Sequence, residues 1–210
     1  TSKAGLLNHA TQMRRQIGST SKPLFDYAPS IEYNNTSTYT LLGDEEYAYS
    51  DGHAIQNYDG GYKGMITTRE AVVDSRNIPA LKTFQKVSKE VGNSKIVSFA
   101  KSLGLTPEVS NGTIHEAHAI GGYNGESPLS MAAAYASFGN GGYYIEPYSY
   151  TKVVFRSNEG VVEKQINKTI KTSTRTTLWR LLFFFSFIFF LIYWTWLISC
   201  SLYKYDWFFL

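Results

Sequence analysis

An abrupt change of composition constrains this chain more than any other feature. Residues 178–210 hold all four Trp, 8 of the 13 Phe and the single Cys of the 210-residue sequence. The residues before them are mixed and polar, and many are Gly, Asn, Thr or Tyr. We therefore treat residues 1–163 as a body and residues 164–210 as a tail, because one set of folding expectations does not fit both.

The tail contains a stretch that is long and apolar enough to span a membrane. Residues 181–200 carry no charge, and a helix of that length rises about 30 Å, which matches the hydrocarbon core of a bilayer. The sequence predicts a basic polar linker at 164–180, this transmembrane-like segment at 181–200 and an aromatic tail at 201–210. Lys and Arg gather before the apolar stretch rather than after it, so the positive-inside rule places the body in the cytoplasm.

Net charge and cysteine content exclude several functions. Lys and Arg total 20 against 17 Asp and Glu, a formal net charge of +3, which is too small for a nucleic-acid-binding surface. The single Cys200 excludes an internal disulfide and a Cys-based zinc finger. His115 and His118 lie three residues apart without a third ligand, which is typical of a protein surface rather than of a metal site. We therefore expect no nucleic-acid partner, no metal ion and no cofactor.

The pattern of apolar residues in the body predicts helices with some strand. Leu81, Phe84, Val87 and Val91 recur at helical spacing and indicate a buried stripe. The expected helices are 67–74, 79–92, 93–104 and 127–139. Residues 31–64 lack a helical period and are rich in Asn, Thr, Asp and Gly, so we expect loops or short strands there. Alternation at 148–155 predicts a further strand.

Ser19 and Lys22 form the first candidate site. Gly18 precedes a small hydroxyl residue, which is typical of a helix start. The spacing of three places Ser19 and Lys22 on one helix face, where an uncharged lysine amine could take the proton of the serine. For that, the lysine pKa, ordinarily about 10.4, must fall by roughly 3 units through burial and neighbouring positive charge. Ser-x-x-Lys occurs four times in the chain, so a capped helix with a solvated lysine stays open as the alternative.

Ser75-Arg76-Asn77 is the only Ser-x-Asn sequence in the chain. It lies between a short predicted helix and the helix expected to begin near Pro79, so we expect a loop. A hydroxyl and an amide two residues apart can point into the same cleft. An ordinary loop that ends one helix and begins the next stays open as the alternative.

These two motifs, 56 residues apart and in this order, resemble the first two motifs of the penicillin-recognising serine enzymes. Three flanking stretches also match that family: Asp26–Pro29, Ile120–Gly122 and Ser127–Ala136. Over about residues 8–163 the chain is similar to the transpeptidase domain of class A (bifunctional) penicillin-binding proteins of Gram-positive bacteria. The resemblance implies an α+β fold: a partial penicillin-binding-protein/β-lactamase-like serine transpeptidase fold, mainly its helical half, followed by the apolar helix-like tail.

The resemblance implies a role for each candidate residue. Ser19 is expected to be acylated by a D-Ala-D-Ala stem peptide of peptidoglycan or by a β-lactam, and Lys22 to accept its proton. Ser75 is expected to relay a proton to the leaving group, and Asn77 to bind the amide side chain of the acyl donor. The backbone N–H of Ser19 is expected to be one oxyanion donor. The family also implies attachment to the cell membrane with the domain on the extracellular face, which conflicts with the charge pattern around the apolar stretch.

The sequence departs from the family's pattern on its C-terminal side. The family's third motif is Lys-Thr-Gly-Thr, on a strand that carries a carboxylate-binding lysine and the second oxyanion donor. The nearest string here, Lys171–Thr174, lacks the glycine. The early strands that precede the first motif in the family are also missing, so we expect a domain truncated at both ends. We interpret the residues after about 164 as the product of a shifted reading frame, because T-rich codons encode the Phe, Leu, Ile, Tyr, Trp, Cys and Ser that dominate the tail.

Three functions stay open on the sequence alone. The first is a penicillin-binding D,D-transpeptidase fragment for peptidoglycan cross-linking by acyl-serine chemistry, impaired because the Lys-Thr-Gly strand is absent. The second is an inactive, membrane-associated remnant of a disrupted gene. The third is a serine β-lactamase, which we disfavour because the chain offers no convincing counterpart of the deacylating glutamate of those enzymes.

Overall fold

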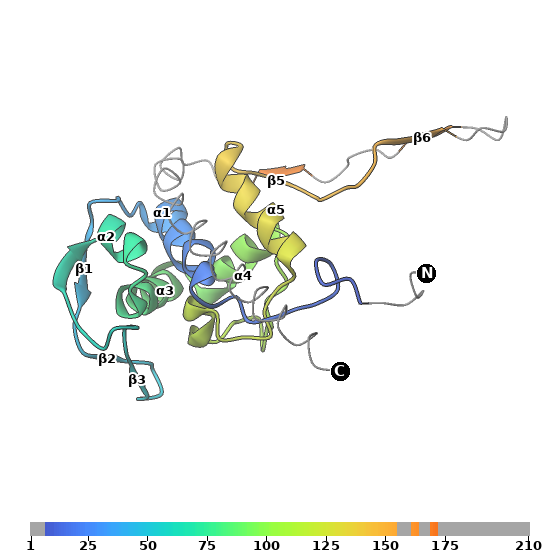
Figure 1. The fold of residues 1–210 in the computed structure, drawn as a ribbon. Coiled ribbons are helices and arrows are strands. Elements are labelled where there is room, and N and C mark those ends of the chain that lie inside the picture. The colour runs from blue at the N-terminus through green and yellow to red at the C-terminus, as the bar shows by residue number, and fades with distance from the viewer. Residues whose placement is uncertain (1–6, 155–160, 164–168, 172–210) are drawn as a thin grey trace, which may run out of the picture.

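The structure is a computed structural model that describes residues 7–154, 161–163 and 169–171 (Figure 1). The expected transmembrane-like segment 181–200 and the aromatic tail 201–210 lie outside the described residues. Within the described ranges, no helix is long and apolar enough to cross a membrane. The described residues are therefore almost entirely those of the body.

The first helix of the body changes its helical type twice. A 3-10 turn, η1 (Gly18–Ser21), leads through Lys22 into a π-helix, η2 (Pro23–Tyr27), which continues as α1 (Ala28–Asn34). Every residue of η2 is buried. Asn35 ends the run in the left-handed conformation, with φ +55°.

The prediction of loops or short strands for residues 31–64 is wrong at its start, because α1 continues through Asn34. Ile31 is only 2% exposed, so packing against the core stabilises a helical turn that the local composition does not favour. The rest of the segment forms short strands, as expected. They are β1 (Leu41–Asp44), β2 (Tyr47–Ala48), β3 (Ala54–Ile55) and the first residue of β4 (Gly64–Thr67).

The described strands form two-stranded antiparallel ribbons. β1 pairs with β4, so that Leu42 lies opposite Ile66, and β2 pairs with β3. The other ribbons are β5 (Tyr143–Ile145) with β8 (Thr169–Lys171), and β6 (Lys152–Val154) with β7 (Val161–Glu163). β6 occupies only part of the predicted strand 148–155, and β8 lies within the segment expected to be a linker. Figure 1 shows β6 extending away from the helical body.

Four further helices form where the sequence predicted them. They are α2 (Thr68–Val73), α3 (Asn77–Val91), α4 (Asn93–Ser102) and α5 (Pro128–Gly139), and the 3-10 helix η3 (Glu116–Ile120) precedes α5. Thr67 and Glu70 begin α2 with a capping box, in which each side chain accepts the backbone N–H of the other residue. Ser127 caps α5 by accepting the N–H of Ser130 at 3.1 Å.

α3 lies at the centre of the body. It packs against η2, α1, α4 and η3, and in Figure 1 it lies between the β1–β3 side of the molecule and α5. The predicted stripe is confirmed for Leu81, Phe84 and Val87, which are fully buried, whereas Val91 at its end is only partly buried. Phe25 from η2 and Phe99 from α4 belong to the same buried cluster. The apolar core therefore supports the helical run that carries Ser19 and Lys22.

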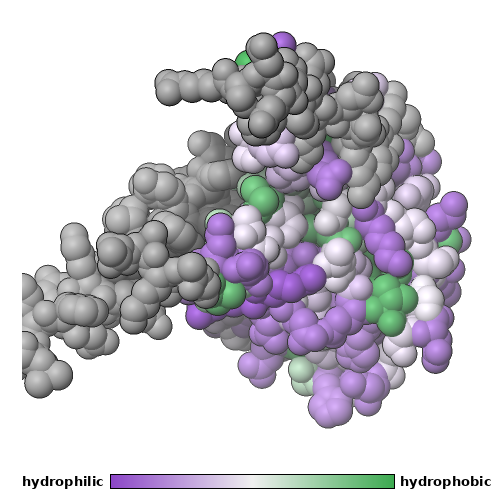
Figure 2. All heavy atoms as spheres, turned by 90° about the vertical axis from the view of Figure 1, so that its right-hand side faces the viewer, coloured by the Kyte–Doolittle hydropathy of each residue, from purple (hydrophilic) through white to green (hydrophobic). Residues whose placement is uncertain are grey.

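One face of the molecule offers little contiguous apolar area. On this face, shown in Figure 2, the described residues are mainly hydrophilic and the hydrophobic side chains form separate small patches. Tyr39, Leu41 and Met65, in and beside the β1–β4 ribbon, are among the exposed large side chains. A few exposed apolar side chains are ordinary for a folded domain and indicate no partner by themselves.

Candidate active site

Ser19 is the second residue of η1, and it is exposed. Hydrogen bonds to η3 and to α5 hold the turn around Ser19. The Ser21 hydroxyl donates to the carbonyl of Ala119 in η3 at 2.8 Å. The Tyr135 hydroxyl in α5 donates to the carbonyl of Thr20 at 2.7 Å. The position of Ser19 therefore depends on η3 and α5 as well as on its own helix.

Gly121 allows the end of η3 to approach this turn closely. It has φ +81°, and a Cβ atom added there would lie 2.3 Å from both the N and the O of Gly18. Gly18 itself has φ +54°. Both positions favour glycine because an L side chain is strained at positive φ, and at Gly121 it would also collide with backbone. This glycine belongs to the stretch Ile120–Gly122 that matches the family, but the sequence did not indicate why a glycine is needed there.

The Lys22 amine contacts the second motif. Lys22 is 2% exposed, and its Nζ lies 2.5 Å from the Ser75 carbonyl oxygen, 3.1 Å from Ser75 Oγ and 2.7 Å from Asn77 Oδ1. Three of the four candidate residues therefore meet. The Ser19 hydroxyl has no hydrogen-bond partner among the described residues. Its own link to Lys22 is through the backbone, where the carbonyl of Ser19 accepts the N–H of Lys22.

The environment of Lys22 makes its amine easier to deprotonate. Burial, opposed by the Asp26 carboxylate and assisted by the Arg76 guanidinium, lowers the pKa of Lys22 from 10.5 to about 8. This agrees in direction with the fall that a lysine base requires. The sequence predicted burial and a nearby positive charge, but did not identify Arg76 as the source of that charge.

Ser75 and Asn77 lie in a tightly held turn between α2 and α3. Ser75 has φ +50°, a left-handed conformation that costs an L residue about 1–2 kcal/mol, and its N–H donates to the carbonyl of Val72 at 3.1 Å. The backbone N–H of Asn77 donates to Asn57 Oδ1 at 2.8 Å, and its side-chain Nδ2 donates to the carbonyl of Gln56 at 2.8 Å. The expected loop is thus a single turn, since Asn77 already begins α3.

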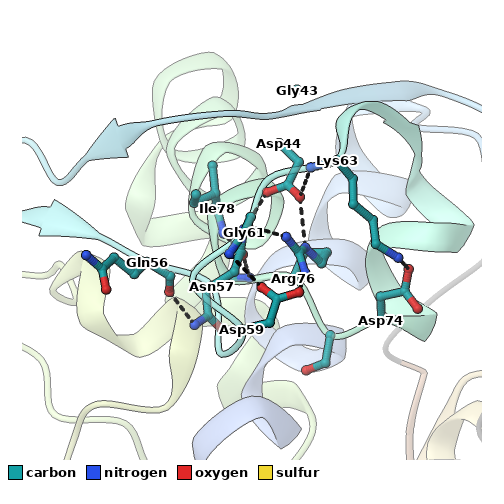
Figure 3. A network of polar contacts seen from close by, with 12 residues as sticks. Gly43, Asp44, Gln56, Asn57, Asp59, Gly61, Lys63, Asp74, Arg76 and Ile78 are labelled. Carbon is teal, nitrogen blue, oxygen red and sulfur yellow. Dashed lines mark hydrogen bonds and ion pairs between the residues drawn. The ribbon is translucent and has the colours of Figure 1, made fainter.

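A buried charge network lies behind this turn (Figure 3). Arg76 is fully buried, with Nε 2.8 Å from Asp44 Oδ2 and Nη1 2.7 Å from Asp59 Oδ2. Its Nη2 donates to the carbonyl of Gly61, and Asn57 Nδ2 donates to Asp44 Oδ1 at 2.7 Å. The middle residue of the Ser-x-Asn motif therefore connects the candidate site to β1 and to the loop before β4.

Sequence reasoning missed Asp44, Asn57 and Asp59. They lie in the segment 31–64, for which the sequence predicted only loops or strands. The available signal was indirect: an arginine between two site residues, if buried, requires carboxylate partners. The sequence alone did not indicate which of its acidic residues would be those partners.

The arrangement is suited to proton transfer. A neutral amine donates two hydrogen bonds and accepts one, so Lys22 can donate to the Ser75 carbonyl and to Asn77 Oδ1 while it accepts from the Ser75 hydroxyl. Among the described residues, no group of three or more His, Cys, Asp or Glu side chains could hold a metal ion. The expectation that both histidines lie at the surface is wrong for His118, which is 3% exposed because its ring stacks on Tyr123 with the centroids 4.5 Å apart.

Comparison with known proteins identifies the relatives of the chain. A family model described as the penicillin binding protein transpeptidase domain matches residues 2–178, which includes most of the segment expected to be a linker. The chain is 46% identical over 159 residues to penicillin-binding protein 1A/1B of Bacillus subtilis, and 40% identical over 158 residues to penicillin-binding protein 1A of Streptococcus pneumoniae. These alignments cover 74% and 71% of this chain but only 16% and 21% of the two relatives.

Solved structures share the fold. Penicillin-binding protein 1A from Haemophilus influenzae is 31% identical, with a TM-score of 0.59 over 70% of this chain and 21% of that chain. Penicillin-binding protein A from M. tuberculosis, solved as an imipenem acyl-enzyme complex, has a TM-score of 0.64 over 85% of this chain and 44% of that chain. At 18% identity the second likeness concerns the fold alone. The expected partial α+β fold of this family is therefore confirmed.

Proposed function

Because this chain belongs to the family of penicillin-binding protein transpeptidase domains, with class A relatives in Gram-positive bacteria, we propose that it is an acyl-serine D,D-transpeptidase domain for peptidoglycan cross-linking. Its substrates are stem peptides that end in D-Ala-D-Ala, and β-lactams acylate the same serine. It works at the extracellular face of the cell membrane. One observation carries the proposal: the buried Lys22 amine lies within hydrogen-bonding distance of both Ser75 Oγ and Asn77 Oδ1.

In the proposed acylation, Ser19 Oγ attacks the carbonyl carbon between the two D-Ala residues, and its proton passes to Lys22 Nζ. The C–N bond then breaks. The Ser75 hydroxyl gives a proton to the departing amine and regains one from Lys22, which is again uncharged. In the second half-reaction an acceptor amine attacks the acyl carbon, its proton passes to Lys22, and Lys22 returns a proton to Ser19 Oγ as the ester bond breaks. Asn77 orients the acyl donor beside Lys22.

We also propose that the 210-residue chain acylates slowly. The backbone N–H of Ser19 is the proposed first oxyanion donor. The second belongs, in the family, to the Lys-Thr-Gly strand, and Lys171–Thr174 lacks the glycine. Loss of one oxyanion donor slows acyl transfer by about 100- to 1,000-fold in other enzymes. A measurable but slow reaction with β-lactams is therefore expected.

Labelling with a fluorescent penicillin tests the proposal. The full chain is incubated with the reagent, and the labelled peptide is identified by mass spectrometry. We expect label on Ser19, and none in Ser19→Ala. Ser98→Ala is the matched control, because Ser98 begins another Ser-x-x-Lys sequence, on the surface of α4, and its loss should leave labelling unchanged. Folded protein that takes no label would support the inactive remnant, and steady hydrolysis of nitrocefin would support a β-lactamase.

A further inference from the structure

Asp26 is a buried carboxyl group that the proposed mechanism does not use. It lies in η2, four residues after Lys22, and it is fully buried. Neither of its carboxyl oxygens has a hydrogen-bond partner among the described residues. Burial raises the pKa of Asp26 well above its ordinary value, and Lys22 opposes that rise. Because no described residue donates a hydrogen bond to the carboxylate, its charge depends on nearby positive groups.

Asp26 and Lys22 influence each other's charge. The carboxylate raises the pKa of Lys22, and Lys22 lowers the pKa of Asp26, because opposite charges interact strongly where water is excluded. The hydrogen bonds of the Lys22 amine go to the uncharged oxygens of Ser75 and Asn77. Those bonds orient the amine without supplying negative charge, which Asp26 supplies when it is ionised.

The other charged groups around η2 do not duplicate this role. Arg76, itself paired with Asp44, acts on Lys22 in the opposite direction. η2 packs against η1, α1, α3, α4 and η3, and of their titratable side chains His118 alone is buried. Its ring centroid lies 6.0 Å from that of Phe25, and burial lowers its pKa. The remaining ones are partly or fully exposed: Glu32, Tyr33, Lys82, Lys86, Lys89, Glu90, Lys95, Lys101 and Glu116.

We propose that Asp26 is a positioning residue for acylation, whose carboxylate stabilises the ammonium that Lys22 becomes when it takes the proton of Ser19. This inference rests on the function proposed above. The O–H bond of Ser19 breaks, a pair of electrons on the oxygen forms the bond to the substrate carbonyl carbon, and the proton goes to Lys22 Nζ. No proton moves to or from Asp26, whose negative charge balances the new positive charge. Asp26 acts through Lys22 and touches no reacting atom.

The pH dependence of acylation in Asp26→Asn tests this role. The substitution keeps the size of the side chain and removes its charge. The pKa of Lys22 should then fall, so the rising limb of the acylation rate against pH should shift lower by about one unit or more. The plateau rate should fall about tenfold, because Lys22 becomes a weaker base without a counter-charge. An unchanged profile overturns the proposal, since Asp26 would then be uncharged throughout.

Tyr27→Phe is the matched control. Tyr27 is the next residue, equally buried, and its hydroxyl also lacks a hydrogen-bond partner among the described residues. Burial raises the pKa of Tyr27 and of Tyr123, and lowers that of His118, so these groups titrate outside the range in which Lys22 does. The profile of Tyr27→Phe should therefore coincide with that of the unaltered chain.

A second measurement separates this proposal from the function on which it rests. NMR of the full chain with isotopically labelled lysine side chains reports the pKa of Lys22, with the signal assigned by its loss in Lys22→Arg. Asp26→Asn should lower that pKa and Tyr27→Phe should not. If the unaltered chain takes no penicillin but the shift appears, the proposed function fails while the charge coupling is supported. If the pKa does not move, the proposal is overturned whether or not the chain is acylated.

Asp26→Leu provides a second variant if the asparagine amide disrupts folding. Leucine has a similar volume and no polar atom to bury, so it removes the charge without adding an unpaired donor. Circular dichroism establishes that each variant is folded before either measurement. The same downward shift of the Lys22 pKa is expected, and its absence in a folded Asp26→Leu chain counts against the proposal equally.

Discussion

Replacement of Arg76 by methionine should destabilise the fold strongly. Its guanidinium pairs with the fully buried Asp44 at 2.8 Å and with Asp59, which is 39% exposed, at 2.7 Å. Without it, Asp44 keeps the hydrogen bonds from Asn57 Nδ2 at 2.7 Å and from the N–H of Lys63 at 3.0 Å, but no ion pair among the described residues. Removal of one partner from a buried ion pair costs about 3–5 kcal/mol. We assign most of this loss to Asp44, because water screens Asp59.

Urea denaturation followed by circular dichroism measures this loss. With a slope of about 2 kcal/mol per M, typical of a small domain, 3–5 kcal/mol lowers the midpoint by about 1.5–2.5 M. Lys82→Met is the matched control: Lys82 pairs at 2.6 Å with Glu45, which is 67% exposed, so its loss should cost under about 1 kcal/mol. The double variant Arg76→Met, Asp44→Asn removes both charges. The free energy of unfolding that the double variant loses should be about 1–3 kcal/mol smaller than the sum of the losses in the two single variants.

If Arg76→Met lowers the urea midpoint no more than Lys82→Met does, the ion pair of Arg76 with Asp44 does not stabilise the fold as proposed. Asp44 would then accept a proton or water at little cost once its partner is gone. The variant should also slow labelling by fluorescent penicillin, because Arg76 lies between Ser75 and Asn77. A displacement of about 1 Å in such a site can cost about 100-fold in rate.

Three further predictions concern the turn around Ser19, a helix cap and the charge of Lys22. Gly121→Ala should slow penicillin labelling about 100-fold, because the added Cβ would lie 2.3 Å from the backbone of Gly18. Gly112→Ala is the control: Gly112 is also at positive φ but has open space around it, so this variant should label normally and lose only about 1 kcal/mol of unfolding free energy. Equal labelling rates of the two variants would contradict this prediction. Thr67→Ala should lose about 1 kcal/mol in thermal unfolding, because α2 loses its capping box. The pKa of Lys22 is about 8 in the fold against an ordinary 10.5. Between these pH values the unfolded chain therefore binds more protons than the folded chain. As the pH rises through this range, the free energy of unfolding measured in urea should increase by about 3 kcal/mol, and Lys22→Met should lack this increase.

Local signals in the sequence were sufficient to predict α2, α3, α4 and α5, although not η3. The spacing of Leu81, Phe84 and Val87 predicted α3, and all three side chains are buried. Thr67 and Ser127 marked the starts of α2 and α5. Such predictions succeed because helical periodicity and capping depend on residues within a few positions of each other. The same reasoning failed at the end of α1, where contact with the distant core extends a helix through residues of weak helical preference.

The sequence by itself determined the family of the chain and the identity of its candidate residues, because motifs are stretches of adjacent residues. Only the tertiary structure decided that Lys22 meets Ser75 and Asn77, and that Arg76 is neutralised by Asp44 and Asp59. It also decided that Asp26 is buried with no hydrogen-bond partner in the part of the chain that the structure describes. These facts depend on which distant side chains meet and on how completely water is excluded around them. Neither spacing nor composition contains that information, since the charge state of a buried group is set by its surroundings in space.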